Sequence, residues 1–175
     1  MNATKTLMEQ TQWTEKPRTV LFVCTGNTCR SPMAAALYND MTRPREICTA
    51  CADAELEPLH GVALSAGLYA DEGAPISAEA VAVLQEASVM PMPEHDYTAH
   101  TARNVTREMM ENADLVVGIS ARHAMELTLR FPEHAAKIVS MPMDISDPFG
   151  QGVAAYRTCL VQLRYCLQLL SKGLC

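Results

Sequence analysis

The sequence predicts a single α/β domain of the doubly wound type, with a four-stranded parallel sheet and helices on both faces. Short apolar runs alternate with helical patterns along the chain, and this alternation is typical of parallel sheets. The first run, Val20–Cys24, is apolar throughout, as expected of a strand that is buried on both faces. With 175 residues, of which 49% are hydrophobic, the chain has the size and composition of one domain with its own core.

Each predicted element follows from the local spacing of apolar residues. The four strands are predicted over Val20–Cys24, Gly61–Ala66, Leu115–Ile119 and Lys137–Met141. Helices are predicted over Pro32–Met41, Ala78–Ala87, Thr106–Asn112 and 121–130, and from Val153 to near the C-terminus. The predicted N-caps of three helices are Ser31, Ser77 and Ser120. The last helix has an apolar stripe made of Val153, Tyr156, Leu160, Leu163, Leu167 and Leu170.

Two segments do not fit this pattern. Residues 1–17 are polar and without periodicity, which predicts a flexible N-terminal arm, so the domain is expected over residues 18–175. Residues 42–60 are interpreted as an irregular insertion that carries Cys48 and Cys51 as a C-x-x-C pair. Since a zinc site needs four ligands and no second pair lies near, the sequence predicts no metal and no cofactor.

Charge and cysteine content narrow the function classes. The net charge of −6 argues against nucleic acid or an anionic membrane as a partner. We find no signal-peptide pattern and no apolar run of the ~20 residues that a membrane helix needs. The seven cysteines are an odd number and do not resemble a disulfide framework, so a cytoplasmic location is expected. A monomer is favoured.

The loop after the first strand, Cys24–Ser31 (CTGNTCRS), is suited to bind an anion. In a doubly wound sheet, such loops bind ligands near the switch point of the strand order. The helix that follows directs free N–H groups and the positive end of its dipole into the loop. Gly26 and Asn27 tolerate the backbone angles that turn successive amides inward, and Arg30 can hold two phosphate oxygens at once. The spacing and lysine of a Walker loop are absent.

Cys24 adds a nucleophile to this anion site. A thiol that faces inward amides, a helix N-terminus and Arg30 is expected to be a thiolate at neutral pH. It would lie below a bound phosphorus atom, which suits in-line attack and a phosphocysteine intermediate. A Cys-x5-Arg spacing arises easily by chance in a chain with seven cysteines, so the prediction rests on the whole loop and its flanking strand and helix.

The motif CTGNTCRSPMA, from Cys24 to Ala34, resembles the signature of low-molecular-weight protein phosphatases. The later motif DPFG, from Asp147 to Gly150, resembles the acid motif of that family. Between them, Ser65-Ala66-Gly67, His100-x-Ala-Arg103 and Ala113-Asp114-Leu115 occur in the expected order, so the resemblance covers about residues 19–172.

This resemblance implies roles for individual residues. Cys24 would be the nucleophile and Arg30 the phosphate clamp, while Asn27 would hold the loop shape and Ser31 would hydrogen-bond the thiolate. The residues expected to contact phosphate or substrate are Thr25, Gly26, Asn27, Thr28, Cys29, Ser31 and Phe149, with Ser65 and Tyr69 in support.

Asp147 is the predicted proton donor. Cleavage of a phosphoester or phosphoramidate bond needs a proton for the leaving group. Pro148 keeps Asp147 out of helical geometry and stiffens its loop. The resemblance implies that Asp147 is the general acid in the first step and the base for water in the second.

Two positions favour phosphoarginine over phosphotyrosine in a protein substrate. Tyrosine-directed members of the family usually have an aliphatic residue at the position of Thr28 and a second aromatic residue after the acid motif. Here Phe149 is followed by Gly150, a pattern that resembles the arginine-phosphatase branch. A rim hydroxyl can support a polar guanidinium, and a lone ring can pack on its flat face. The alternative is a low-molecular-weight protein tyrosine phosphatase.

Further alternatives are an arsenate reductase-like enzyme and a non-catalytic phosphate-binding or thiol-sensor module. The relay of an arsenate reductase needs cysteines in the middle of the chain, and none lies between Cys51 and Cys159. A binding module would not need an acid such as Asp147. Cys29 could form a reversible disulfide with Cys24. The five histidines lack metal-ligand spacing, so surface or structural roles are expected for all of them, His123 included.

Overall fold

The computed structural model of the chain describes residues 19–43 and 61–173. The predicted N-terminal arm, over residues 1–17, lies outside the described residues. So does most of the predicted insertion, including Cys48 and Cys51.

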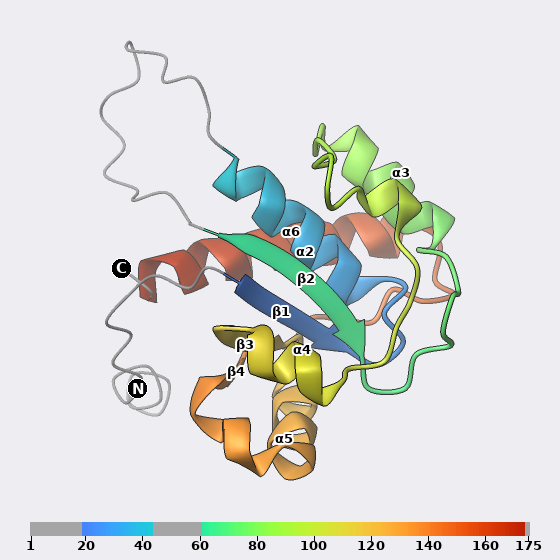
Figure 1. Ribbon diagram of the computed structural model, residues 1–175. Helices are drawn as coiled ribbons and strands as arrows, with labels where there is room; N and C mark the ends of the chain where they lie inside the picture. The colour runs from blue at the N-terminus through green and yellow to red at the C-terminus, as the bar shows by residue number, and fades with distance from the viewer. Residues whose placement is uncertain (1–18, 44–60, 174–175) are drawn as a thin grey trace.

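Four parallel strands form the sheet at the centre of the fold (Figure 1). They are β1 (Thr19–Cys24), β2 (Val62–Gly67), β3 (Leu115–Gly118) and β4 (Ile138–Ser140), in the spatial order β2-β1-β3-β4. The strand order therefore reverses between β1 and β3, as in other doubly wound sheets. The predicted parallel sheet and fold class are confirmed, and every strand boundary lies within one residue of its prediction.

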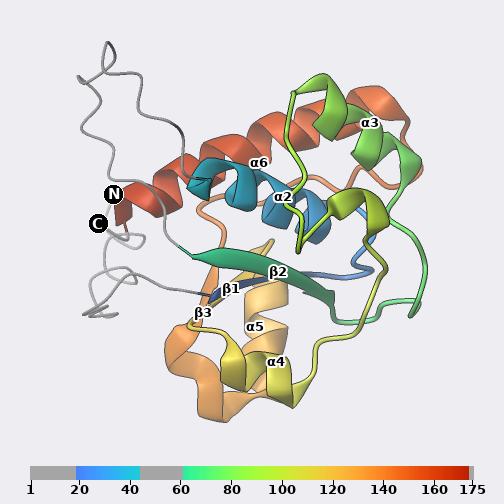
Figure 2. The same cartoon turned by 45° about the horizontal axis from the view of Figure 1, so that its top comes forward.

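Helices cover both faces of the sheet (Figures 1 and 2). One face carries α2 (Arg30–Thr42), α3 (Ala78–Glu86) and α6 (Val153–Gly173), and the other carries α4 (Arg107–Asn112) and α5 (Ala121–Arg130). Two short 3-10 helices, η1 (Tyr97–Ala99) and η2 (Pro132–Lys137), were not predicted. Among the described residues, no helix has the length and apolar content that a membrane span requires.

The side chains of β1 alternate between two cores. Phe22 and Cys24 belong to the cluster on the side of α2 and α6, whereas Leu21 and Val23 belong to the cluster on the side of α4 and α5. Successive strand residues point to opposite faces, and both faces are covered, so an uninterrupted apolar run is required here. The predicted stripe of α6 is likewise buried, apart from the partly buried Val153.

The beginning of α2 differs from the prediction. The helix starts at Arg30 with Cys29 at the N-cap position, so Ser31 is not the N-cap and Pro32 is not the first helical residue. Pro32 still falls in the first turn, where its missing N–H costs nothing. The Ser31 hydroxyl does not cap the helix but lies 3.0 Å from Cys24 Sγ and 3.2 Å from Ala66 O of β2.

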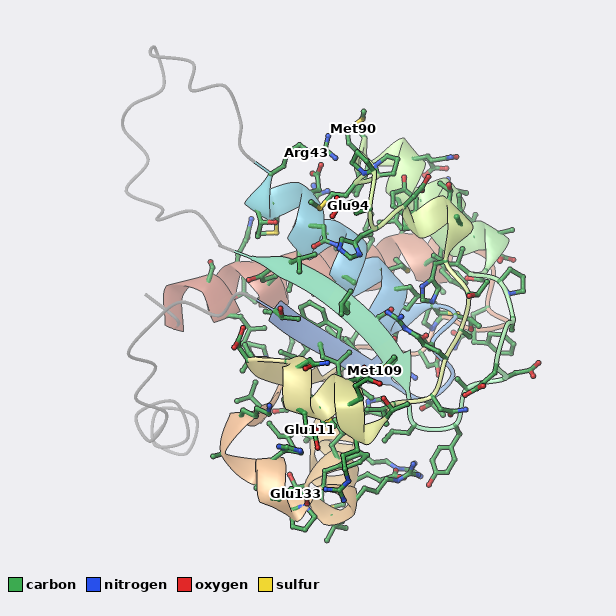
Figure 3. All side chains as sticks on the ribbon, viewed as in Figure 1. Arg43, Met90, Glu94, Met109, Glu111 and Glu133 are labelled. Atoms are coloured by element: carbon green, nitrogen blue, oxygen red, sulfur yellow. The ribbon has the colours of Figure 1, made fainter. Side chains whose placement is uncertain are left out.

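The other two predicted caps have different outcomes. Ser120 precedes α5 and its side chain accepts a hydrogen bond from His123 N, as predicted for an N-cap. Ser77 occupies the N-cap position of α3, but its hydroxyl donates to Thr28 O rather than capping the helix. Just after the other end of α2, Arg43 donates to the backbone oxygens of Met90 and Pro91 (Figure 3). These bonds hold the segment that follows α3 against α2.

Candidate active site

The loop that joins β1 to α2 lies at the switch point of the sheet. It leaves the carboxyl end of β1, next to the carboxyl end of β3, where Ile119 N donates to Val23 O at 2.9 Å. The chain turns to one face after β1 and to the opposite face after β3. The crevice between these two loops is the expected ligand site of such a sheet.

The sulfur of Cys24 lies at the floor of this loop. Cys24 is buried, with 2% of its surface exposed. Asn27 N donates to Cys24 Sγ at 3.3 Å, and Ser31 Oγ lies 3.0 Å from the same sulfur. Ser31 has one hydroxyl proton, which can go to Cys24 Sγ or to Ala66 O at 3.2 Å. These contacts hold the sulfur at the floor of the loop, in the position expected of the predicted nucleophile.

Asn27 holds the loop in shape through four hydrogen bonds besides the one from its backbone N to Cys24 Sγ. Its φ of 57° lies in the left-handed region, which asparagine tolerates better than most residues. Its Nδ2 donates to Ser31 Oγ at 2.9 Å and to Ser65 Oγ at 3.0 Å. Its Oδ1 accepts from Arg103 N at 3.0 Å, and its backbone oxygen accepts from His100 Nε2 at 2.9 Å. Asn27 and Ser65 are both buried, so these bonds are shielded from water.

Arg30 and Asp147 meet across the crevice although they are far apart in sequence. Arg30 Nη2 donates to Asp147 Oδ2 at 2.7 Å, and Arg30 Nη1 donates to Ile145 O at 3.5 Å. The Arg30 side chain is 10% exposed and that of Asp147 is 53% exposed. Asp147 also accepts from Phe149 N at 3.3 Å, and this bond bends the loop before α6, here called the acid loop, into a turn. The predicted clamp and the predicted acid therefore lie in one site.

Cys29 and Thr28 are held by residues of α3 and α6. Cys29 Sγ lies 3.0 Å from Tyr156 Oη and 3.5 Å from Ser77 Oγ. Burial and this contact raise the pKa of Tyr156, so the phenol is protonated and can donate to the sulfur. Ser77 N donates to Thr28 O at 2.9 Å, and the half-buried Thr28 side chain has its Oγ1 3.5 Å from Cys29 Sγ. The sequence analysis assigned Tyr156 to the apolar stripe of α6 and missed its contact with Cys29.

The remaining residues that were predicted to contact or support a substrate differ in how far they are exposed. Thr25 is exposed and Gly26 half-buried, while Phe149 is 70% exposed. Tyr69 N donates to Thr25 O at 2.9 Å, so its backbone supports the loop. Its ring lies against α5, under the Arg130 guanidinium at 4.5 Å. A role for the Tyr69 side chain as a wall of the site stays a prediction.

Gly67 lets the end of β2 approach the loop closely. A Cβ at this position would lie 2.7 Å from Thr25 O and 3.2 Å from Asn27 Cβ. The first of these distances is too short for any side chain, so glycine is required here by the loop and not by its own backbone angles.

Two histidines that sequence reasoning treated as ordinary contact the loop. His123 is 5% exposed, and its Nε2 lies 3.0 Å from Thr25 Oγ1. Burial, followed by the charges of Arg30 and Arg122, lowers the pKa of His123 to about 4. Burial is also the largest cause that lowers the pKa of His100. Residues that follow β3 must lie next to the loop that follows β1, and this was the available signal for His123.

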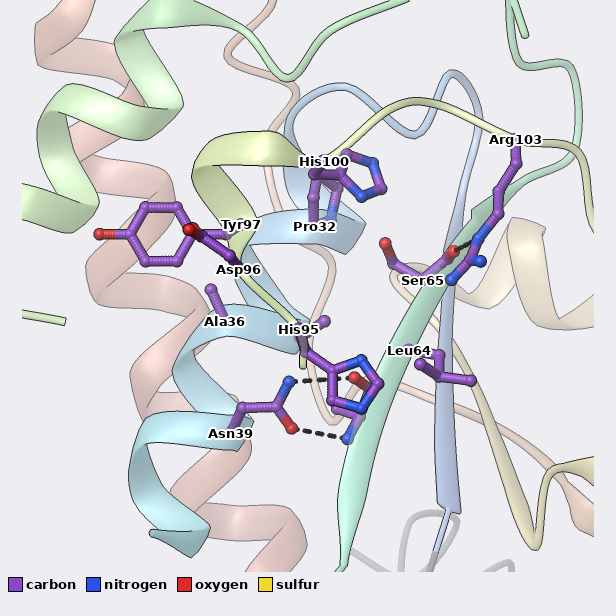
Figure 4. A pocket seen from close by; sticks show the side chains of 12 residues that line it. Pro32, Ala36, Asn39, Leu64, Ser65, His95, Asp96, Tyr97, His100 and Arg103 are labelled. Carbon is purple, nitrogen blue, oxygen red and sulfur yellow. Dashed lines mark hydrogen bonds between the residues drawn. The ribbon is translucent and has the colours of Figure 1, made fainter. Parts of the chain in front are cut away.

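A pocket of about 90 Å³ lies beside this loop, between α2, the edge strand β2 and the segment that contains η1 (Figure 4). Asn39 exchanges two hydrogen bonds with the backbone of Ala63, and Arg103 Nε donates to Ser65 O at 3.0 Å. These side chains pair with the free edge of β2 as a neighbouring strand would. None of the three predicted catalytic residues lines this pocket.

Comparisons with known proteins show the family of this chain and agree with its fold. The protein-family model described as low molecular weight phosphotyrosine protein phosphatase matches residues 19–174. A protein-arginine-phosphatase of Bacillus subtilis (strain 168) is 32% identical over 162 residues, which cover 89% of this chain and 95% of that protein. The structure of YwlE arginine phosphatase from Geobacillus stearothermophilus has a TM-score of 0.72 at 31% identity, covering 89% of this chain and 92% of that one.

A tyrosine phosphatase is similar to the same degree. The structure of the low molecular weight protein tyrosine phosphatase from T. tengcongensis has a TM-score of 0.71 at 34% identity, and it covers 88% of this chain and 98% of that one. Overall similarity therefore does not separate the two substrate classes, and the residues at the rim have to be considered individually.

Proposed function

Because the chain belongs to the low molecular weight protein phosphatase family, we propose that this enzyme hydrolyses phosphoarginine in proteins through a phosphocysteine formed on Cys24. The observation that carries the chemistry is the arrangement of Cys24, Arg30 and Asp147 around one crevice. The nucleophile is a buried sulfur that accepts from Asn27 N and lies 3.0 Å from Ser31 Oγ, the clamp is a guanidinium, and the acid is a half-exposed carboxyl group.

The first step transfers the phosphoryl group to sulfur. The Cys24 thiolate attacks phosphorus in line with the leaving nitrogen, the S–P bond forms and the P–N bond breaks. Arg30 and the backbone N–H groups of the loop hold the phosphoryl oxygens and stabilise the charge that they carry in the transition state. Asp147 gives its proton to the leaving nitrogen, so the arginine side chain departs protonated.

The second step releases phosphate. The Asp147 carboxylate takes a proton from a water molecule whose oxygen attacks phosphorus, and the S–P bond breaks to restore the Cys24 thiolate. Asp147 is then protonated again, so one cycle consumes one water molecule and yields inorganic phosphate. Every group needed belongs to the protein, and the proposal includes no metal and no cofactor.

Two residues at the rim support arginine as the substrate side chain. Thr28 is half-buried and supplies a hydroxyl to the loop, where an aliphatic residue would favour the flat ring of a tyrosine. Phe149 is exposed after the acid loop and can stack on a guanidinium face. Gly150 follows it, so no second ring closes the site from this side.

We place the enzyme in the cytoplasm as a monomer. The cysteines among the described residues, Cys24, Cys29, Cys159 and Cys166, are all free thiols. Free thiols suit a reducing compartment, and a catalytic thiolate would be oxidised outside one.

The test is kcat/KM on matched phosphoarginine and phosphotyrosine peptides for the wild type and Thr28→Ile. We expect the wild type to prefer phosphoarginine, and Thr28→Ile to reduce that preference by about tenfold, the usual effect of one lost polar contact. Thr158→Ile, at an exposed position of α6, is the matched control and should retain the wild-type preference.

Each outcome is informative. A wild-type preference for phosphotyrosine would contradict the arginine assignment and leave a tyrosine phosphatase. Hydrolysis that persists in Cys24→Ser would contradict the phosphocysteine, because serine at this position is a far weaker nucleophile and leaving group.

A further inference from the structure

His123 lies below the loop and connects it to the first turn of α5. Its Nε2 is 3.0 Å from Thr25 Oγ1, and its Nδ1 is 2.8 Å from Ser120 Oγ. Relying on the phosphatase function proposed above, we propose that the chain Ser120–His123–Thr25 is a positioning device that aims the Thr25 hydroxyl proton at the phosphoryl group in the loop.

The direction of the hydrogen bonds follows from the chemistry of imidazole. A neutral imidazole has one N–H donor and one acceptor nitrogen. In one arrangement Ser120 donates to Nδ1, Nε2–H donates to Thr25 Oγ1, and the Thr25 proton is left for the ligand. In the reverse arrangement Thr25 donates to His123 and only its lone pairs face the ligand. A bound phosphoryl dianion accepts but does not donate, so it selects the first arrangement.

Ser120 can donate to His123 Nδ1 and still cap the N-terminus of α5. Its Oγ already accepts from His123 N at 3.4 Å as the N-cap of α5. Accepting that bond uses a lone pair and leaves the hydroxyl proton free for Nδ1. The start of α5 therefore fixes the Nδ1 side of the His123 ring, and the Nε2 side of the ring fixes the hydroxyl of Thr25.

The charges around His123 keep its ring neutral, as this role requires. Arg30 from α2 and Arg122 on α5 disfavour a proton on the ring, as does burial, while Glu126 on α5 and Asp147 in the acid loop act weakly in the opposite sense. A neutral ring both accepts from Ser120 and donates to Thr25, whereas an imidazolium could only donate.

Thr25 is the member of the chain that a ligand can reach. It directly follows Cys24 and is exposed at the loop, whereas His123 is buried below it. The Thr25 backbone is also held, because its carbonyl oxygen accepts from Tyr69 N at 2.9 Å. A hydroxyl fixed at both its backbone and its oxygen is preorganised to donate to an anion in the loop.

Calorimetric titration of inorganic phosphate into the wild type and five variants tests the proposal. Thr25→Val and His123→Phe should each raise Kd about tenfold, as expected for one hydrogen bond to a charged group. His123 acts through Thr25, so the double variant should bind within about twofold of Thr25→Val alone. Thr25→Ser should restore wild-type binding because it keeps the hydroxyl. Thr158→Val, on the exposed side of α6, is the control for a threonine-to-valine change.

Multiplying effects in the double variant, or unchanged Kd in Thr25→Val, would overturn the proposal. If His123→Phe does not fold, His123→Gln replaces it, because a glutamine amide cannot span Ser120 and Thr25 together and should also weaken binding. Calorimetry needs no turnover, so a wild type that binds phosphate but hydrolyses neither phosphopeptide would contradict the proposed function alone. A wild type that binds no phosphate would overturn the positioning role.

Discussion

Arg30 Nη2 donates to Asp147 Oδ2 at 2.7 Å, and this contact joins the proposed phosphate clamp to the proposed proton donor. Arg30 is buried at the first turn of α2, while Asp147 lies half-exposed in the loop before α6. A phosphoryl group in the loop would compete with the carboxylate for the same guanidinium. Binding therefore exchanges one anionic partner of Arg30 for another and frees Asp147 to meet the leaving group.

Asp147→Asn should separate chemistry from binding. Without the acid, kcat on a phosphopeptide should fall by about 10²–10⁴, the usual contribution of general acid catalysis. Without the competing negative charge, the Kd for inorganic phosphate should fall. Steady-state kinetics and calorimetry measure the two effects. Asp144→Asn, in the same loop, is the control and should leave kcat nearly unchanged. An undiminished kcat in Asp147→Asn would rule out the acid role.

Gly67→Ala, at the end of β2, should displace the loop that follows Cys24. The added methyl group would meet Thr25 O at 2.7 Å, so the loop has to move. We expect a loss of about 2 kcal/mol in the free energy of unfolding, as for other overpacked sites, together with weaker phosphate binding. Denaturant melts and calorimetry measure both.

Gly73→Ala is the matched control for this substitution. Its φ of 86° makes alanine strained, but nothing lies within 4 Å of the added methyl group. It should therefore lose about 1 kcal/mol of stability and keep its affinity for phosphate. Equal phosphate affinities for the two variants would show that Gly67 does not act through the loop.

The pH dependence of stability should show the buried His123. Its pKa is lowered to about 4 in the folded protein, while in the unfolded chain it has its ordinary value near 6.5. Below pH 6.5 the unfolded chain therefore binds the proton first, so stability is complete above this pH and falls as the pH drops towards 4. The loss should reach roughly 3 kcal/mol. His123→Gln should flatten this part of the curve, and an unchanged slope would contradict the prediction.

Oxidation should link Cys24 and Cys29. We expect peroxide to inactivate the wild type, a thiol reductant to restore it, and peptide mapping to find a Cys24–Cys29 disulfide. In Cys29→Ala the sulfenic acid on Cys24 lacks this partner, so recovery should be smaller. If Cys29→Ala regained full activity after peroxide treatment and reduction, Cys29 would not be the residue that protects Cys24.

The sequence determined those features that depend on neighbouring residues. Strand boundaries were predicted to within one residue because burial on both faces leaves a continuous apolar run, as in β1. The sequence likewise predicted that the loop from Cys24 to Arg30 binds an anion, because its proposed nucleophile, turn residues and clamp are close together in the sequence. The N-cap predicted at Ser31 was wrong, because the Ser31 hydroxyl bonds to Cys24 Sγ and to Ala66 O of β2 instead of to the backbone of α2.

Only the tertiary structure decided which distant side chains complete the site. Asn27 is held by Ser65, His100 and Arg103, and Thr25 is held by His123. The sequence motifs included Ser65, His100 and Arg103 but did not show which atom of the loop each of them would contact. They arise because parallel strands bring their carboxyl ends to one edge of the sheet, so that segments 38 to 98 positions apart meet around one loop. Whether a buried histidine packs in a core or orients a hydroxyl depends on which atoms lie within 3 Å of its ring, and the packing of β1 against β3 sets that distance.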